Sequence, residues 1–322
     1  MDYAGFSSAS DQVGFAFDQD GVDLLIEDPT GQMEFSLAEE SNPDLDAVEV
    51  ATGTGSGHLI RLEDTALVTH LGLGEAQAPM TVALSDIPAK ARGAYVSEAL
   101  ITKDYLWVRV GHCDTTTLAW GFATFGDGEF HLREMDASTQ PEDIAVGEGT
   151  IDSETADRSG TWAMDPDALG HLNLEMAGES YEAWTVPGES LIMTQPDGLL
   201  VAVANPTAHL SVLKAAGVYK FLDVRCDADG TMDQGVGNFQ VFDREVSLIR
   251  YDSQGDTTTQ EGMLGFYEPV GSAFGIIARG EEGAEEATNV SYFALAGDMG
   301  VIFHFGETQR VGIAMKVGIA GL

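Results

Sequence analysis

The feature that most constrains the fold is a long succession of short apolar or alternating segments, each bounded by glycine, aspartate, asparagine or proline. Examples are YLWVRV at 105–110, EFHLRE at 129–134 and GVIFHF at 300–305. Alternation with a period of two is typical of β-strands, and Asp-Gly pairs tolerate the left-handed backbone of tight hairpin turns. Such pairs are Asp20-Gly21, Asp127-Gly128, Asp197-Gly198 and Asp229-Gly230. The sequence therefore predicts an all-β fold of antiparallel hairpins with very little helix, the best helical candidates being 86–101 and 206–217.

Three stretches of similar pattern predict about three weakly related repeats. GFAFDQDGVDLLIED from Gly14, GFATFGDGEFHLREM from Gly121 and GNFQVFDREVSLIRYD from Gly237 share a glycine, spaced phenylalanines, a turn and a strand with an acidic end. A unit of about 110 residues is the size of a small antiparallel β-sandwich or β-barrel. We expect tandem units of this kind: β-unit 1 at residues 1–92 with its opening strand missing, a Trp-rich β-unit 2 at 93–215, and β-unit 3 at 216–322.

The charge of the chain is strongly negative. It contains 53 acidic and 15 basic residues, for a formal net charge of -38. Such a chain repels phosphate backbones and anionic lipid surfaces, so we expect no nucleic acid as a partner. No run of about 20 apolar residues is present, so we expect no membrane insertion through a helix.

The same acidity is typical of exported bacterial proteins and of proteins that stay soluble in high salt. We therefore expect an extracellular, cell surface or periplasmic location, with the cytoplasm of a salt-adapted organism as the alternative. The opening stretch MDYAGFSSASDQVGFAF lacks the basic and apolar segments of a secretory signal. The first interpretation therefore requires that the signal peptide is absent from this chain because it was removed.

Cys113 and Cys226 occupy matching places in the second and third units, each followed by an aspartate. A disulfide between them would close a long loop and restrict the unfolded chain. Equivalent positions of tandem units usually lie a domain width apart, so the bridge requires that the two units pack face to face. Two small buried thiols are the alternative, and no motif around either cysteine indicates a catalytic thiol.

The segment CDADGTMDQG is the one candidate for a metal site. Asp227, Asp229 and Asp233 surround Gly230, and hard cations such as calcium prefer oxygen-rich, tightly turned loops of this kind. The EF-hand register fails, because it would place Arg225 at the first ligand position and Val236 at the twelfth. We therefore expect either a calcium site of another type or an ordinary hairpin turn, and no other cofactor.

Aromatic side chains concentrate in the second unit. All four tryptophans lie there, together with Tyr181. The interpretations are a core rich in large side chains or an aromatic-lined pocket for a small apolar or carbohydrate ligand, since sugar rings stack on tryptophan. The candidate ligand-binding residues are Trp107, Trp120, Trp162, Trp184 and Tyr181.

His171 follows the turn of the hairpin SGTWAMDPDALGHLNLEM and is a candidate functional histidine. Strict alternation places it on the strand face of Asn173 and Glu175, away from Leu172 and Leu174. We therefore expect a solvent-facing hairpin residue.

No zinc-protease, Cys-x-x-Cys or nucleophile-elbow motif is present, so we expect no catalysis. The first functional hypothesis is an exported acidic all-β protein that acts by binding or assembly, as a cell-surface, adhesin-like or structural subunit with other protein chains as partners. Self-association would use the final apolar strand, Val311 to Val317, as an exposed edge, and the alternative is that this strand is buried inside the third unit. The alternative is a small-molecule-binding or isomerase-like β-barrel protein with an aromatic pocket in unit 2.

Overall fold

The structure is a computed structural model that describes the strands and part of their connections. For the first eight strands the described side chains are those of Met80, Val82 and Leu84. The residues described are 2–7, 12–17, 23–28, 31–38, 48–52, 55–62, 66–73, 80–85, 101, 103–111, 118–136, 139, 151–166, 168, 170–186, 188–195, 198–204, 215–227, 229–242, 245–252, 257–266, 276–279, 290–305 and 308–318.

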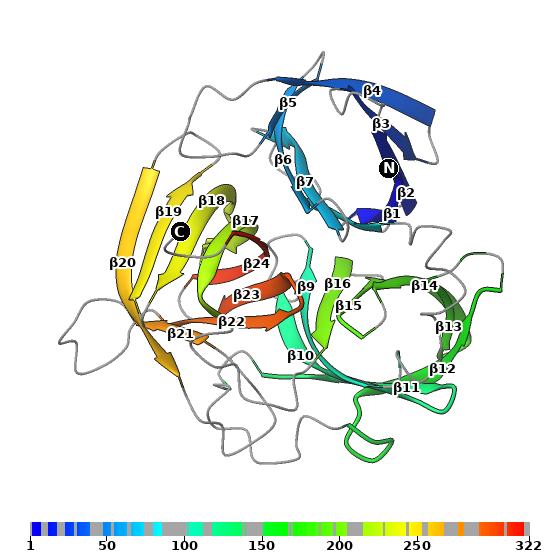
Figure 1. Cartoon of the computed structure of the whole chain (residues 1–322). Coiled ribbons are helices and arrows are strands. Elements are labelled where there is room, and N and C mark those ends of the chain that lie inside the picture. The colour runs from blue at the N-terminus through cyan, green and yellow to red at the C-terminus, as the bar shows by residue number, and fades with distance from the viewer. Residues whose placement is uncertain are drawn as a thin grey trace.

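The described strands form three closed antiparallel β-barrels of eight strands each (Figure 1). Barrel 1 contains β1 (Asp2–Ser7), β2 (Gln12–Phe17), β3 (Asp23–Asp28), β4 (Gly31–Ala38), β5 (Val48–Thr52), β6 (Gly55–Leu62), β7 (Ala66–Leu73) and β8 (Met80–Ser85). Barrel 2 contains β9 (Asp104–Val110), β10 (Ala119–Gly126), β11 (Glu129–Glu134), β12 (Arg158–Met164), β13 (His171–Met176), β14 (Glu179–Val186), β15 (Ser190–Gln195) and β16 (Gly198–Ala204). Barrel 3 contains β17 (Gly217–Cys226), β18 (Met232–Phe242), β19 (Glu245–Tyr251), β20 (Thr257–Phe266), β21 (Ile276–Arg279), β22 (Val290–Ala296), β23 (Met299–Phe305) and β24 (Gln309–Gly318).

In each barrel, every strand pairs with its neighbours in the chain, and the first strand pairs with the last. The predicted all-β class is confirmed, and the sheets close into barrels rather than packing as sandwiches. The predicted repeat and the unit boundaries at residues 92 and 215 stay predictions, because strand pairing does not measure how closely the unit sequences are related. The two helical candidates, 86–101 and 206–217, lie almost wholly outside the described residues.

Barrel 1 contains its own opening strand, so the prediction that this strand is missing was wrong. β1 pairs with β2 on one side, with Tyr3 opposite Phe15, and with β8 on the other, with Gly5 opposite Ala83. The sequence DYAGFS has no run of apolar residues and no counterpart among the segments compared between units. This segment is therefore recognised as a strand by its pairing with β2 and β8 and not by its own residue pattern.

β24 has no free edge, so of the two interpretations of Val311 to Val317 the structure supports burial within the third unit and not an exposed edge for self-association. The strand pairs with β17 and with β23 along its length. Barrel closure satisfies the backbone hydrogen-bonding groups of a strand on both sides and leaves none to template another chain. Val311, Ile313 and Met315 are also fully buried.

Alternation along each strand divides the side chains of barrel 2 between its interior and its outer surface. On β9, Tyr105 and Trp107 belong to the cluster that fills the interior, whereas Leu106, Val108 and Val110 belong to a different cluster outside the barrel. Tyr105 donates a hydrogen bond to the carbonyl of Ile101, and burial raises the pKa of its hydroxyl. The interior is therefore packed along most of its length.

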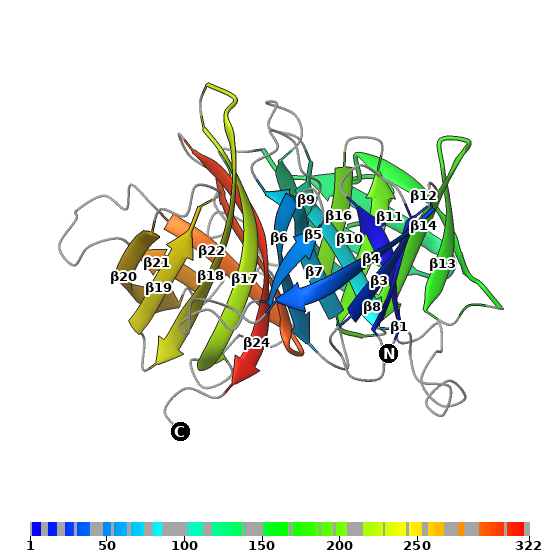
Figure 2. The ribbon, with the colours of Figure 1, turned by 90° about the horizontal axis from the view of Figure 1, so that it is seen from above.

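The outer cluster is the junction at which the three barrels meet. It combines outward-facing residues of β8 with those of β9, β10 and β16 from barrel 2 and of β17 and β22 to β24 from barrel 3. Trp120 of barrel 2 stacks on Phe303 of barrel 3, with ring centroids 4.9 Å apart. Figure 2 shows β17 and β24 beside β6 and β7 of barrel 1, in agreement with their contacts. Apolar packing thus joins the barrels.

Among the described residues, no helix has the length and apolar character needed to cross a lipid bilayer.

Candidate functional site

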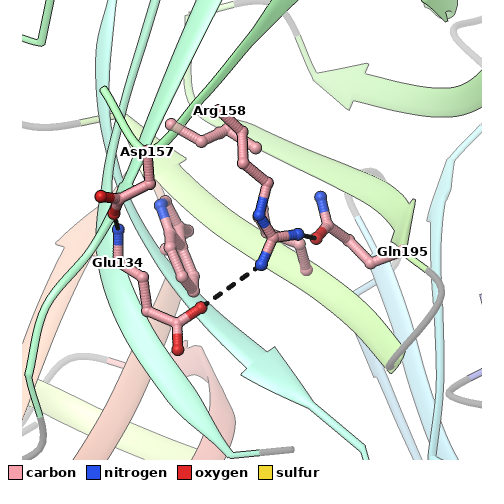
Figure 3. Close-up of a pocket in the computed structure, with 7 residues that line it drawn as sticks. Glu134, Asp157, Arg158 and Gln195 are labelled. Atoms are coloured by element: carbon pink, nitrogen blue, oxygen red, sulfur yellow. Dashed lines mark hydrogen bonds and ion pairs between the residues drawn. The ribbon is translucent and has the colours of Figure 1, made fainter. Parts of the chain in front are cut away.

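A cavity of about 220 Å³ lies inside one end of barrel 2. Glu134 ends β11, Arg158 begins β12 and Gln195 ends β15, so the polar side chains lie at the mouth of the barrel (Figure 3). Apolar residues from β9, β11 and β16 form the deeper walls. The lining residues are Trp107, Leu132, Glu134, Asp157, Arg158, Gln195 and Leu200.

Trp107 is positioned by a glycine on the adjacent strand. Gly121 lies directly opposite Trp107 in the pairing of β9 with β10. A Cβ atom on Gly121 would lie 2.0 Å from the carbonyl oxygen of Arg133 and 2.6 Å from Cζ2 of Trp107. The indole Nε1 also donates a hydrogen bond of 2.9 Å to the carbonyl of Phe122. The ring is therefore fixed against the barrel wall.

Replacing Gly121 with alanine should push the Trp107 ring into the cavity. Because the new methyl group has no room, we expect the free energy of unfolding to fall by about 1–3 kcal/mol, as for overpacked cores. Urea denaturation followed by circular dichroism measures this change. Gly318→Ala is the control, because the nearest neighbour of its Cβ would be an ordinary 3.8 Å away at Val218. Equal stability of the two variants would show that Gly121 does not fix the ring.

Glu134, Arg158 and Gln195 supply polar groups to the cavity, and Arg109 of β9 pairs with Glu134 from outside its lining. Arg109, which is 3% exposed, contacts the Glu134 carboxylate at 3.1 and 3.4 Å. Arg158 donates a hydrogen bond of 2.8 Å to Oε1 of Gln195, and its Nη2 lies 3.6 Å from Oε2 of Glu134. The Arg158 guanidinium thus spans the mouth between β11 and β15 (Figure 3).

Asp157 adds a carboxylate at the outer rim. Its Oδ2 accepts a hydrogen bond of 2.8 Å from the backbone N–H of Glu134, and the residue is exposed. The charged residues that line the cavity are therefore Glu134, Asp157 and Arg158.

Barrel 3 contains a different ionic cluster at the corresponding end. In barrel 2, Gly121 of β10 lies between Trp107 on β9 and Glu134 on β11. In barrel 3, Gly237 of β18 lies in the same way between Phe221 on β17 and Arg250 on β19. The same register places Asp223 where barrel 2 has Arg109. The Arg109–Glu134 ion pair of barrel 2 therefore corresponds to an Asp223–Arg250 pair with the charges exchanged.

The cluster of barrel 3 is filled by its own side chains. Asp223 is 0% exposed and accepts hydrogen bonds from Arg250 and Arg310, and Arg250 also pairs with Asp233 at 2.8 Å. The Arg310 guanidinium carbon lies 5.1 Å from the ring centroid of Phe221. The space over the aromatic ring, which is part of the cavity in barrel 2, is thus occupied by an arginine in barrel 3.

The ionic cluster predicts a site-specific acid sensitivity. Burial alone opposes ionisation of Asp223, but the charges and hydrogen bonds of Arg310 and Arg250 outweigh burial and hold the pKa of Asp223 below its usual value. Its contribution to stability is therefore complete above the unfolded-state pKa of about 3.9 and is lost as the pH falls through the lower folded-state value. Carbon-13 NMR should show the Asp223 carboxyl titrating below about pH 3.9. A midpoint at or above that value would contradict the ion pairing.

The structure does not bring the predicted aromatic residues into one pocket. Trp107 and Trp162 lie inside barrel 2, and Tyr181 packs against the same interior cluster. Trp120 is in the junction between the barrels, and Trp184 packs against that junction from outside barrel 2. Of the five, only Trp107 lines the cavity described above. Alternation places Trp120 and Trp184 on the outer side of the barrel wall, whereas Trp162 and Tyr181 belong to the interior but do not line the cavity.

His171 is buried, so the prediction of a solvent-facing residue was wrong. It is 7% exposed; its Nδ1 lies 3.0 Å from Oδ2 of Asp165, and its ring lies 4.9 Å from that of Trp184. Leu172 and Leu174 belong to the interior cluster, whereas His171 lies against Trp184, which packs outside the barrel, as alternation predicts. Asp165 and the Trp184 ring lie against it, which a period-two pattern does not reveal.

The three aspartates of the predicted calcium loop point to different partners. Asp227 accepts a hydrogen bond from Arg225, and Asp229 accepts one from the backbone N–H of Thr231 in the exposed turn. Asp233 pairs instead with Arg250 inside barrel 3. Within the described ranges, no group of three or more His, Cys, Asp or Glu side chains is placed to hold a metal ion.

Cys226 is disulfide-bonded and 6% exposed, and it belongs to the junction cluster. The sequence contains one other cysteine, Cys113, which lies outside the described residues.

The polar residues of the cavity were missed by sequence reasoning. Arg109 gave the available signal, because it interrupts the apolar strand YLWVRV on the same face as Tyr105 and Trp107. A charge on the interior face of such a strand requires a buried partner. Sequence reasoning had no such signal for Glu134 and Arg158, because both lie at strand ends, where charged residues usually meet solvent.

The fold and the cavity define an all-β protein of three closed barrels, the second of which contains a small cavity at its mouth. No protein-family model matches the chain. No curated protein matches it either.

The solved structures with weak similarity to the chain include the following three. Intact Ap-TbpB (N and C lobes) is 8% identical with a TM-score of 0.28, and the match covers 95% of this chain and 66% of that one. A protein of unknown function from the DUF3598 family of Nostoc punctiforme is 7% identical with a TM-score of 0.18, covering 98% and 94%. A candidate AttH from Nitrosomonas europaea is 8% identical with a TM-score of 0.19, covering 98% and 91%. At these TM-scores the similarities carry no argument about function.

Proposed function

We propose that the chain is a binding protein whose second barrel holds a small molecule in the cavity over Trp107, without a reaction of its own. The observation that carries this proposal is the set of residues that line this partly open cavity. Trp107, Leu132 and Leu200 supply apolar walls, and Arg158, Glu134 and Gln195 converge at the mouth. An apolar pocket with a few convergent polar groups is the usual form of a small-molecule site.

The volume of the cavity limits the size of the ligand. Pockets for drug-sized ligands usually have volumes of about 300–1,000 Å³, whereas a buried apolar cavity of about 150 Å³ accepts benzene. A space of about 220 Å³ therefore suits a molecule with one ring and a small polar substituent.

Closure of the barrels supports ligand binding over assembly by strand addition. Each of the three described sheets is closed, so none offers an unpaired strand to a second chain. The acidic composition alone supports the further proposal that the protein works outside the cell or at its surface.

Titration with benzamide and benzyl alcohol, two neutral single-ring probes, tests the proposal. Nitrogen-15 NMR resolves the indole N–H signals of the four tryptophans, and the Trp107→Phe variant identifies the signal of Trp107. We expect at least one probe to shift the Trp107 signal most, because its ring lines the cavity.

Leu132→Phe should abolish this shift, because the larger ring fills the cavity. Leu248→Phe is the matched control, since Leu248 occupies the corresponding register position of barrel 3. The proposal fails if no probe perturbs Trp107, or if the two leucine variants reduce binding equally.

A further inference from the structure

We infer that Arg158 sets the size limit of the ligand in barrel 2, because its hydrogen bond to Gln195 crosses the mouth of the barrel above the cavity. This inference rests on the proposed function and names the residue that determines the specificity of that site. Three observations support it: the path of the hydrogen bond across the barrel, the exposure of the residues above and below it, and the different place of an arginine in barrel 3.

The first observation is that the hydrogen bond joins two strands that are not neighbours. Arg158 begins β12 and Gln195 ends β15, and β13 and β14 separate these two strands in the barrel. Both side chains line the cavity, and Nη1 of Arg158 lies 2.8 Å from Oε1 of Gln195 (Figure 3). The contact therefore crosses the opening of the barrel and is not part of its wall.

The guanidinium of Arg158 also has an acceptor on β11. Its Nη2 lies 3.6 Å from Oε2 of Glu134, and that carboxylate is itself paired with Arg109 at 3.1 Å. The guanidinium is planar and presents its N–H groups in a fixed geometry, so acceptors on two sides restrict its orientation. Arg158 is thus held across the mouth, between β11 and β15.

The second observation is that exposure falls sharply below Arg158. The side chains of Arg158 and Glu134 are 35% and 38% exposed, so both meet solvent. The apolar residues that line the cavity, Trp107, Leu132 and Leu200, are 3%, 3% and 2% exposed. The polar side chains therefore lie between solvent and the apolar walls, and a ligand must pass them to reach Trp107.

The third observation is that an arginine of barrel 3 fills the space that is a cavity in barrel 2. Arg310 lies over Phe221, with its guanidinium carbon 5.1 Å from the ring centroid, and Phe221 corresponds by register to Trp107. The side chain of Arg310 is 12% exposed, against 35% for Arg158. Arg310 therefore occupies the interior of its barrel, whereas Arg158 lies nearer to solvent and leaves room beneath it.

The size limit follows from this arrangement. A molecule with one ring fits the cavity of about 220 Å³ while Arg158 keeps its hydrogen bond. A fused second ring would extend into the mouth and displace Arg158 from Gln195. The loss of one hydrogen bond to a charged group corresponds to about 10-fold in affinity or more. We therefore expect barrel 2 to select ligands with one ring over ligands with two.

Two pairs of neutral probes test the inference, so that the result depends on size and not on charge. Benzamide is compared with naphthamide, and benzyl alcohol with naphthylmethanol. Isothermal titration calorimetry on the whole chain gives each affinity, and the Trp107 indole signal reports binding in the cavity. We expect the single-ring member of a pair to bind at least about 10-fold more tightly. Arg158→Ala should remove this preference, because the mouth is then open to the second ring.

Gln195→Leu is a second variant, which keeps the approximate side-chain volume and removes the acceptor of Arg158. It should lower the preference in the same direction as Arg158→Ala. Arg133→Ala is the matched control, because Arg133 lies on β11 opposite Phe122, an outward-facing residue of the junction. This variant should keep the preference for one ring.

Three results would overturn the role of Arg158. They are equal or tighter binding of the two-ring probes by the unsubstituted chain, an unchanged preference in Arg158→Ala and Gln195→Leu, and an equal loss of preference in Arg133→Ala. In each case a probe still shifts the Trp107 signal, so the proposed function stands. If no probe shifts that signal, both proposals fail.

Discussion

The variant Asp223→Asn should lose about 3–5 kcal/mol of unfolding free energy, the usual cost of removing one partner from a buried ion pair. The carboxylate is completely buried and faces Arg250 and Arg310, whose side chains are 7% and 12% exposed. Without its charge, two guanidinium groups remain inside barrel 3 with Asp233 as their counter-charge. Urea denaturation of the whole chain, followed by circular dichroism, measures the loss.

Asp229→Asn is the matched control for this experiment. Asp229 lies in the exposed turn between β17 and β18 and accepts a hydrogen bond from the backbone N–H of Thr231, which an asparagine oxygen also accepts. Its substitution should change the free energy of unfolding by less than about 0.5 kcal/mol, as for most surface changes. Similar effects of the two variants would show that the interior cluster does not stabilise barrel 3.

A second substitution set separates charge pairing from packing. Replacing Asp223, Arg250 and Arg310 together by Leu, Met and Leu removes all three buried charges and keeps their approximate volume. Since buried ion pairs are often no more stabilising than apolar side chains of similar size, this variant should recover most of the loss. Asp233, which is partly exposed, then accepts water in place of Arg250. A triple variant as unstable as Asp223→Asn would contradict the charge argument.

Loss of the disulfide should be the other large effect. We propose that Cys226 pairs with Cys113, which is the other cysteine of the sequence. The bridge would then close a loop of roughly 110 residues, and the chain-entropy model gives about 4–5 kcal/mol for a loop of that length. Cys226→Ser should lower the unfolding free energy by about 2–5 kcal/mol, the range observed on removing native disulfides.

The pairing makes its own prediction about additivity. Cys113→Ser, Cys226→Ser and the double variant should be equally destabilised, because each breaks the same bond. Peptide mass spectrometry without reductant should also find the two cysteines in one linked species. Additive losses of unfolding free energy, or cysteine peptides that are not linked, would contradict the pairing. Cys226 would then have to be bonded to a cysteine other than Cys113.

The strands could be predicted from the sequence because each carries its own local pattern. EFHLRE alternates clearly and forms β11, and the Asp127-Gly128 turn joins it to β10, with both residues at positive φ. Barrel closure could not be predicted in the same way. It depends on pairing between segments far apart in the chain, such as β9 with β16, and no local pattern records which strands meet.

The candidate site was less predictable than the fold. The sequence showed that tryptophans concentrate in the second unit, and Trp107 does line the cavity. Alternation sends Trp107 and Trp120 to opposite sides of the barrel wall, which became informative only when the register was known. Arg158 and Gln195 meet across the barrel mouth from strands β12 and β15, and their separation along the chain conceals that contact.

The apolar junction has a consequence for how this chain can be divided. Trp120, Val108 and Leu199 are outward-facing in barrel 2, yet they are almost fully buried because the other barrels cover them. A fragment cut out at the ends of one barrel would present this surface to water, and exposed apolar patches of that kind promote aggregation. The barrels therefore form separate hydrogen-bonded sheets, but each one needs the others to keep its apolar outer wall away from water. Engineering that rearranges or excises one barrel must redesign that outer wall.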